Sequence, residues 1–150
     1  MKKLDELIDD LESFIKYQEK SNPTISEGSI GWHIEHCLLT IDIVVAALRR
    51  SVPEQYQPRF NLWKNIIMIS KRIPRGRAKA PKSVRPKNDH TMESLKQHIS
   101  DTKTQIGVFD TLEKNHHFPH PYFGEMNSKQ AMKFLRIHTR HHLKIMNEII

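Results

Sequence analysis

The sequence predicts an all-α protein, a four-helix bundle with one additional short helix and a basic, proline-rich loop. The chain of 150 residues contains only five glycines. It is rich in leucine, lysine and glutamate, whose side chains lose little rotamer freedom in a helix. Apolar residues also recur at three- and four-residue spacing in four long segments. One domain, residues 1–150, is expected because the chain is long enough for one core and short for two.

The first two helices are marked by periodicity and by their ends. Residues 4–18 have the spacing of an amphipathic helix, which the sequence Ser21-Asn22-Pro23 interrupts. Ser29 is suited to cap a second helix that runs to Arg49 and Arg50, since basic side chains favour a helix C-terminus. Pro53 ends this helix.

Two further helices are predicted in the second half of the chain, after a shorter one at 59–73 that Pro74 ends. Residues 74–90 are expected to form a loop, 91–115 a helix, and HHFPHPYFGEM a connector in which Tyr122, Phe123 and Gly124 form a turn. Asn127 and Gln130 then fit the N-cap and N3 positions of the last helix. Four amphipathic helices can bury their apolar faces together in a bundle, and bundles bind metals between facing helices.

The net charge of +7 is concentrated in one segment. Residues 71–87 contain eight basic residues and no acidic one, which leaves 16 basic and 17 acidic residues elsewhere. Three prolines and a lack of interleaved aromatics favour a solvated connector over a nucleic-acid site, although such a loop could attract an acidic group. The N-terminus lacks the apolar run of a secretory signal, and the single cysteine allows no internal disulfide, so a cytoplasmic protein without membrane contact is expected.

Two histidines of the last helix fall within its apolar face. With Ala131 at zero and 100° per residue, His138 lies at about 340° and His142 at about 20°, while His141 lies on the flank at about 280°. Two buried imidazoles one turn apart would leave polar atoms without partners, and a shared metal ion would remove that cost. The i, i+4 spacing alone is weak evidence, and Thr139 stands where the zinc-protease motif H-E-x-x-H needs glutamate.

A third ligand is expected from GWHIEHC, residues 31–37. Periodicity counted from Ile30 favours His33 over His36, which falls at the edge of the apolar face. Other candidates are weaker, because each has a more ordinary explanation as a loop, core or surface residue. They are His116, His117 and His120 in the connector, Cys37 as ligand or nucleophile, and Asp42 as a partner of a ligand.

Three segments resemble the DinB-like superfamily of metalloenzymes in their order and spacing, and within it a branch of domains of unknown function. They are SIGWHIEHCLL, HPYFGEMNSKQ, and H-x-x-H-H followed by Leu143 and Lys144. The resemblance covers nearly the whole chain. It implies a dimeric four-helix bundle that binds a divalent ion through one histidine of the second helix and an H-x-x-x-H pair of the last. By position these are His36, His138 and His142, with His33 in reserve.

Three histidines leave an open position on Zn²⁺ or Ni²⁺, where either a thiol or a water molecule could be activated. The resemblance favours a metal-dependent thiol S-transferase, with a small-molecule thiol and an electrophile as partners. Leu143 and Lys144 replace the arginine and glycine common in the thiol-transferase branches, which separates this chain from them. The alternatives are a non-catalytic bundle for dimerisation or partner binding with a structural or vestigial metal site, a metal-dependent hydrolase, and a nucleic-acid binder through residues 71–87.

Overall fold

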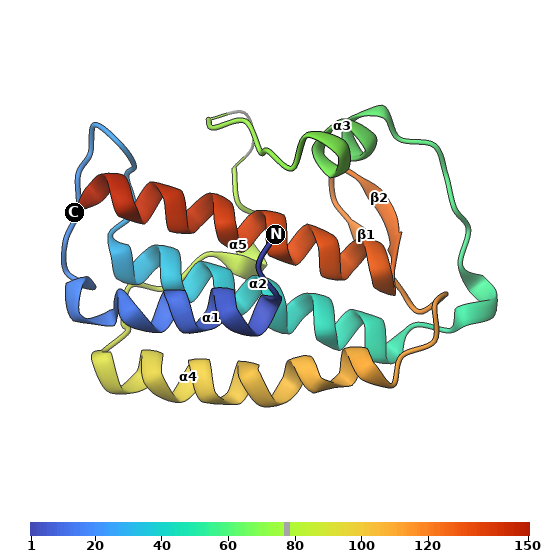
Figure 1. Cartoon of the computed structure of the whole chain (residues 1–150), viewed down its shortest axis with the longest axis horizontal. Helices are drawn as coiled ribbons and strands as arrows, with labels where there is room; N and C mark the ends of the chain where they lie inside the picture. Colours follow the sequence, from blue (N-terminus) through green and yellow to red (C-terminus); the bar gives the residue numbers. More distant parts are fainter. Residues whose placement is uncertain (77–78) are drawn as a thin grey trace.

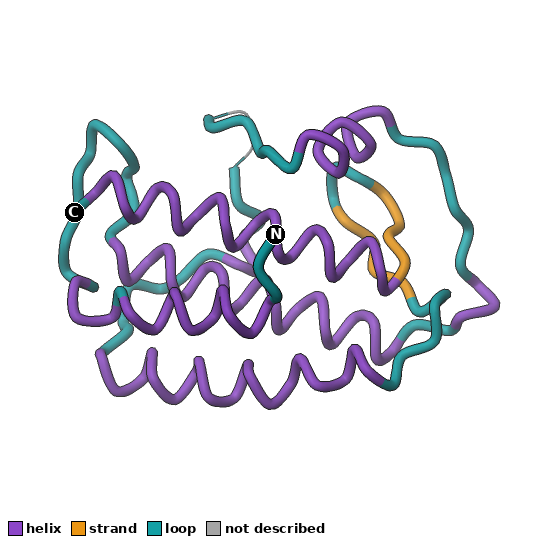
Figure 2. Tube along the Cα trace, viewed as in Figure 1, coloured by secondary structure: helices purple, strands orange, loops and turns teal. Residues whose placement is uncertain are grey.

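A computed structural model describes residues 1–76 and 79–150 and shows a mostly helical protein with one small sheet (Figures 1 and 2). The α-helices are α1 (Leu4–Ser13), α2 (Ile30–Arg50), α3 (Leu62–Ser70), α4 (Met92–Gln105) and α5 (Ser128–Ile149). The strands are β1 (His117–His120) and β2 (Gly124–Asn127). Short 3₁₀ turns η1 to η4 cover Ile15–Tyr17, Pro53–Gln55, Lys82–Val84 and Ile106–Asp110.

The long helices α1, α2, α4 and α5 lie side by side, and each packs against two of the others (Figure 1). Each buries an apolar stripe in one shared core, as the periodicity predicted. Large side chains that are fully buried in this core include Ile8, Leu11, Ile30, Ile34, Leu38, Ile41, Leu48, Leu95, Ile99, Met126, Leu135 and Ile137.

The connector before α5 is a β-hairpin, which the sequence analysis did not predict. β1 and β2 pair antiparallel, with His117 opposite Asn127 and His120 opposite Gly124. The strands are only four residues long and one contains Pro119, a residue that argues against a strand. The expectation of an all-α fold is therefore corrected to a mostly helical fold with a two-stranded sheet beside one end of α5 (Figure 2).

Three helices are shorter than expected. α1 ends at Ser13 and is followed by the 3₁₀ turn η1, where the periodicity predicted one helix over residues 4–18. Asn61 caps α3, because its side chain accepts a hydrogen bond from the Lys64 backbone N–H, and Lys71 ends the helix with a φ of 55°. α4 changes to a 3₁₀ turn at Ile106 beside Gly107, and glycine has low helix propensity. The caps predicted for α2 and α5 are confirmed: Ser29 accepts from Trp32 N–H, and Asn127 and Gln130 form a capping box.

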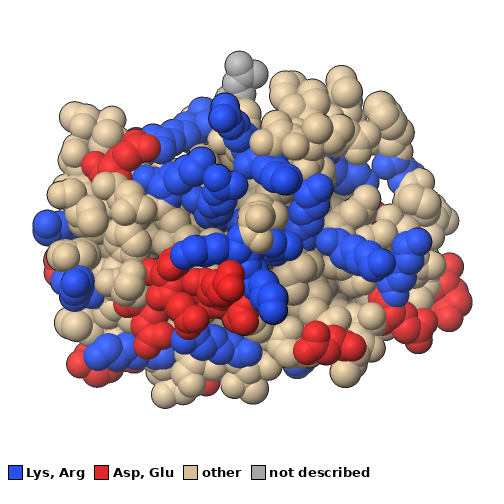
Figure 3. Space-filling view, in the orientation of Figure 1, with Lys and Arg blue, Asp and Glu red and all other residues tan. Residues whose placement is uncertain are grey.

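The basic side chains of residues 71–87 that the structure describes are all exposed, whereas Arg77 lies outside the described residues. Figure 3 shows basic side chains crossing one face of the molecule and acidic ones gathered beside them. The segment is more than a solvated connector, however. Val84 and Pro86 are buried, and η3 packs against α2.

One helix in the described part of the chain, α2, is long and apolar enough to span a membrane by length and composition alone. Its most apolar window is 61% buried inside the protein. That burial, together with its contacts to α4 and α5, makes α2 a central core helix.

Candidate metal centre

Helices α2 and α5 bring the three predicted histidines together. His36 on α2 and His138 and His142 on α5 present ring nitrogens that all lie within 4.8 Å of one another. His36 Nε2 is 3.2 Å from His138 Nε2. Two nitrogens that each lie 2.0–2.1 Å from a tetrahedral zinc ion are about 3.3 Å apart. The spacing of this pair therefore fits two ligands of one ion.

His36 is held with a ring nitrogen free for a ligand role. Its Nδ1–H donates to the backbone oxygen of Val84 at 2.7 Å. Because a carbonyl oxygen only accepts, Nδ1 carries the proton and Nε2 keeps its lone pair. Trp32, one turn earlier, stacks on the His36 ring at 5.0 Å. The orientation of His36 is thus fixed from two sides.

His33 contacts one of the three predicted ligands and is not itself one of the three histidines that converge. Its Nδ1 lies 2.9 Å from His142 Nδ1, and its Nε2 lies 3.0 Å from Ser26 Oγ. If His142 Nε2 faces an ion, its Nδ1–H donates to His33, and His33 Nε2–H donates to Ser26. Metal-binding histidines commonly have such a partner on the second ring nitrogen.

Burial keeps these histidines in the neutral form that binds metals. It lowers the pKa of His36, against a smaller opposing effect of the Val84 hydrogen bond. It also lowers the pKa of His138 and His142 well below 6.5, and the neighbouring histidines lower it further. His138 Nδ1 is buried without a hydrogen-bond partner among the described residues. The residues present fit a divalent ion, because neutral imidazoles are its ordinary nitrogen ligands.

The three histidines line a cavity of about 560 Å³. Its walls come from α2, α5, the hairpin and the segment before η3, and they are mostly apolar. A volume of this size suits a small molecule. The triad therefore faces a space that a substrate could occupy.

The connector histidines have different positions. His116 Nδ1–H donates to Leu48 O at the end of α2, and His117 lies beside Glu125, so neither joins the triad. His120 lines the cavity, and burial lowers its pKa to about 4. Phe123 lies in the turn as expected and stacks on the His120 ring.

Cys37 is fully buried in the core and lies outside the triad. Burial raises the pKa of its thiol, which opposes a role as a ligand or nucleophile. Its position supports the more ordinary explanation, a small apolar core residue.

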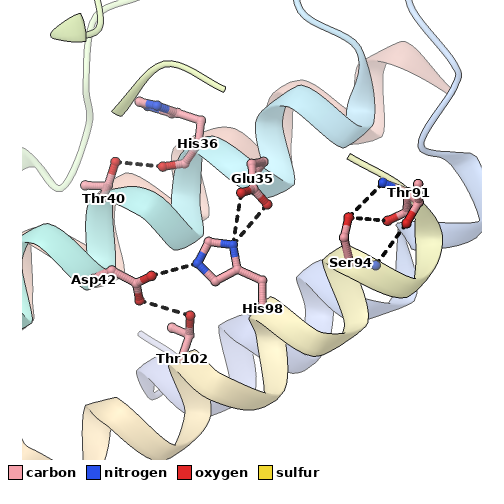
Figure 4. A network of polar contacts seen from close by, with 8 residues as sticks. All are labelled: Glu35, His36, Thr40, Asp42, Thr91, Ser94, His98 and Thr102. Atoms are coloured by element: carbon pink, nitrogen blue, oxygen red, sulfur yellow. Dashed lines mark hydrogen bonds and ion pairs between the residues drawn. The ribbon is translucent and has the colours of Figure 1, made fainter. Parts of the chain in front are cut away.

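Asp42 belongs to a polar network on the other side of α2 (Figure 4). His98 of α4 donates from Nε2 to Asp42 Oδ2 at 2.7 Å and from Nδ1 to Glu35 at 3.0 Å, and Thr102 donates to Asp42 Oδ1. Burial lowers the pKa of His98, but the hydrogen bonds and charges of the two carboxylates raise it to about 9. In Figure 4 His36 points away from this network. Asp42 therefore helps to fix α2 against α4 and does not contact the triad's ligands.

The sequence analysis missed the roles of Val84, Trp32 and Ser26 around the triad. Trp32 lies four residues before His36, which is a usable helical signal. Val84 has no such signal, because it lies 48 residues away and its contribution is a backbone oxygen.

The fold and the triad define a helical protein with a three-histidine candidate metal centre. A family model described as the DinB superfamily matches residues 3–146, nearly the whole chain. The protein belongs to the DinB superfamily, as the motifs suggested. No curated protein and no solved structure matches the chain.

Proposed function

We propose that this protein binds a zinc or nickel ion through His36, His138 and His142 and transfers a small-molecule thiol to an electrophile. The observation that supports this most directly is the convergence of three neutral imidazoles at the wall of a cavity of about 560 Å³. Three ligands leave room for a substrate atom, whereas a structural zinc site is normally closed by four protein ligands.

An ion held there would act as a Lewis acid that favours the thiolate form of a bound thiol, the form that displaces a leaving group from an electrophilic carbon. The chain supplies orientation. Val84 O and His33 each bind the second ring nitrogen of a ligand histidine. Trp32 covers one face of the His36 ring and, with residues of the hairpin, lines the cavity.

The composition of the cavity favours thiol transfer over hydrolysis. Hydrolysis by a three-ligand metal site commonly uses a carboxylate as general base. Within residues 1–76 and 79–150, no aspartate or glutamate lines the cavity. A thiol needs no such base, because binding to a metal ion is enough to deprotonate it.

A second candidate is a non-catalytic DinB-like four-helix bundle that acts in the cytoplasm as a homodimer. Large apolar side chains are exposed on and just before α3, where Figure 3 shows few charged side chains. Exposed apolar patches often mark protein contacts. These residues are Phe60, Leu62, Trp63, Ile66 and Ile69. Sedimentation equilibrium of wild type beside Ile69→Asn tests this candidate: a monomer in both would reject it.

The proposed function is tested by elemental analysis of untagged protein. Wild type should contain close to one zinc or nickel ion per chain, and His36→Ala, His138→Ala and His142→Ala no more than about a tenth of that. His117→Ala is the matched control, since it removes a histidine outside the triad. Circular dichroism establishes that each variant is folded.

A screen for thiol consumption follows with the metal-loaded protein, using 2-mercaptoethanol and an aryl halide. The expected result is turnover that His138→Ala abolishes and His117→Ala retains. The metal assignment would be overturned if the purified wild type contained no metal, or if the His36, His138 and His142 variants still contained it. Metal-loaded protein that consumes no thiol with any electrophile would support the non-catalytic candidate.

A further inference from the structure

The wall of the cavity outside the triad is apolar and aromatic. Its apolar side chains come from separate parts of the chain, so the cavity exists only in the folded protein. They include Trp32 and Ile43 of α2, Phe134 and Ile145 of α5, and Phe118 and Phe123 of the hairpin. Such a wall is stabilised when it covers an apolar ligand, because apolar surface is then removed from water.

Among the residues that the structure describes, few charged side chains line this wall. Arg75 lines the cavity, but its guanidinium is engaged by Glu148 through two hydrogen bonds of 2.6 and 2.7 Å. Lys79 is exposed at the rim. A ligand with several charges would gain little from these walls and would lose hydration.

His120 is the fixed polar group on the hairpin side. Its Nδ1 accepts hydrogen bonds from the backbone N–H groups of Tyr122 and Phe123, at 3.1 and 3.2 Å. A ring nitrogen that accepts carries no proton, so the neutral ring holds its proton on Nε2. Phe123 stacks on the ring at 4.3 Å and Phe134 meets it edge to face at 4.8 Å. His120 thus offers one oriented N–H donor within an apolar surface.

We propose that the cavity binds a ligand with an apolar, ring-sized body, a head group at the triad and one hydrogen-bond acceptor for His120 Nε2–H. The binding of the head group at the triad rests on the proposed function. The new part is the class of substrate, which is an arylalkyl or similarly apolar molecule with a carbonyl-type acceptor and not a highly charged molecule. His120 is the residue that sets this specificity.

The test is ligand binding to the Co²⁺-loaded protein, which requires no turnover. The probes are 2-mercaptoethanol, which is a head group alone, 2-phenylethanethiol, which adds the body, and N-(2-mercaptoethyl)benzamide, which adds a carbonyl. Binding of sulfur to cobalt is followed by its charge-transfer absorption. Occupation of the cavity is followed by Trp32 fluorescence in a Trp63→Phe background, since the chain has two tryptophans and Trp63 is exposed on α3.

We expect 2-phenylethanethiol to bind at least about tenfold more tightly than 2-mercaptoethanol, because its ring is removed from water. The benzamide should bind several-fold more tightly again, and His120→Phe should abolish that last gain alone. Ile43→Asn, which places an amide on the wall, should weaken 2-phenylethanethiol and leave 2-mercaptoethanol unchanged. Val52→Asn is the matched control, because Val52 is 44% exposed and does not line the cavity.

Each failure has a distinct meaning. Equal affinity for the three thiols, with a clear charge-transfer band, overturns the apolar-body proposal and leaves the proposed function standing. A benzamide that gains nothing over 2-phenylethanethiol, or whose gain survives in His120→Phe, overturns the role of His120. The absence of a charge-transfer band with any thiol overturns the proposed function itself.

Discussion

Replacing His98 with glutamine should remove a contribution to stability that falls as the pH rises from about 6.5 to about 8.5. In the folded protein both ring nitrogens of His98 donate to carboxylates, which requires the imidazolium form. The pKa of His98 is about 9 there and 6.5 in an unfolded chain. Because the folded pKa is the higher one, the stabilisation is fully present below about pH 6.5 and is lost as the pH rises through about 9.

The two pKa values set the size of the effect. Between about pH 6.5 and 8.5 they correspond to a loss of about 2 kcal/mol, which solvent screening at the partly exposed ring reduces to about 1 kcal/mol. For a chain of this length, the melting-temperature difference between wild type and His98→Gln should shrink by about 3 °C over this window. The window stops at about pH 8.5 because Cys37, whose thiol is buried, would ionise in the unfolded chain above it.

The assay is thermal and urea unfolding at several pH values within this window, with a chelator present so that metal binding does not contribute. The difference in stability between wild type and His98→Gln should be largest at the lower end of the window and should shrink as the pH rises. Burial lowers the pKa of several other histidines, whose contribution to stability changes with pH in the opposite direction, but they are present in both proteins and cancel in this difference. His117→Gln is the control and should keep the wild-type slope. A difference between wild type and His98→Gln that does not change with pH would refute the assignment of a charged His98.

Two further predictions concern close packing in α2. Gly31→Ala should lower the free energy of unfolding by about 1–3 kcal/mol, because a Cβ there would lie 2.2 Å from His90 Nε2. Gly107→Ala is the control and should lose far less stability, because the space around Gly107 is open. Equal losses of stability in urea titrations of the two variants would contradict this. Cys37 should resist alkylation by iodoacetamide at pH 8 in the native protein and react readily in urea, because it is buried and its thiol pKa is raised; rapid labelling of the native protein would show that the core opens there.

The helices could be predicted from the sequence because their signals are local. Apolar spacing and the caps at Ser29 and Asn127 lie within one or two turns of what they determine, and the structure has both caps. The hairpin could not be predicted in this way. Its strands are too short for a clear alternation, and it depends on packing against α2 and α5.

The triad was predictable only in part. His138 and His142 share a helix face, so their juxtaposition follows from their spacing. Periodicity alone favoured His33 on α2, and the likeness to the DinB superfamily was needed to select His36. The structure shows why the two were hard to separate: both point towards α5, His36 towards the other two imidazoles and His33 towards the outer nitrogen of His142.

The pairing of His98 with Glu35 and Asp42 was not predicted from the sequence. The two acidic residues are seven positions apart on α2, which places them on one face, but nothing local indicates which residue of α4 lies between them. Contacts between helices depend on the packed core, and the sequence of either helix alone does not contain them.

His36 and His138 are 102 residues apart in the chain. An ion held between them would close a long loop that contains α3, α4 and the hairpin, so it could be acquired only after α5 has docked onto α2. Its binding free energy would then contribute to the finished fold and to no earlier folding intermediate. In a chain cut by a protease at the exposed Lys71 or Arg72, the same ion would tie the two fragments together, and a chelator should speed their separation.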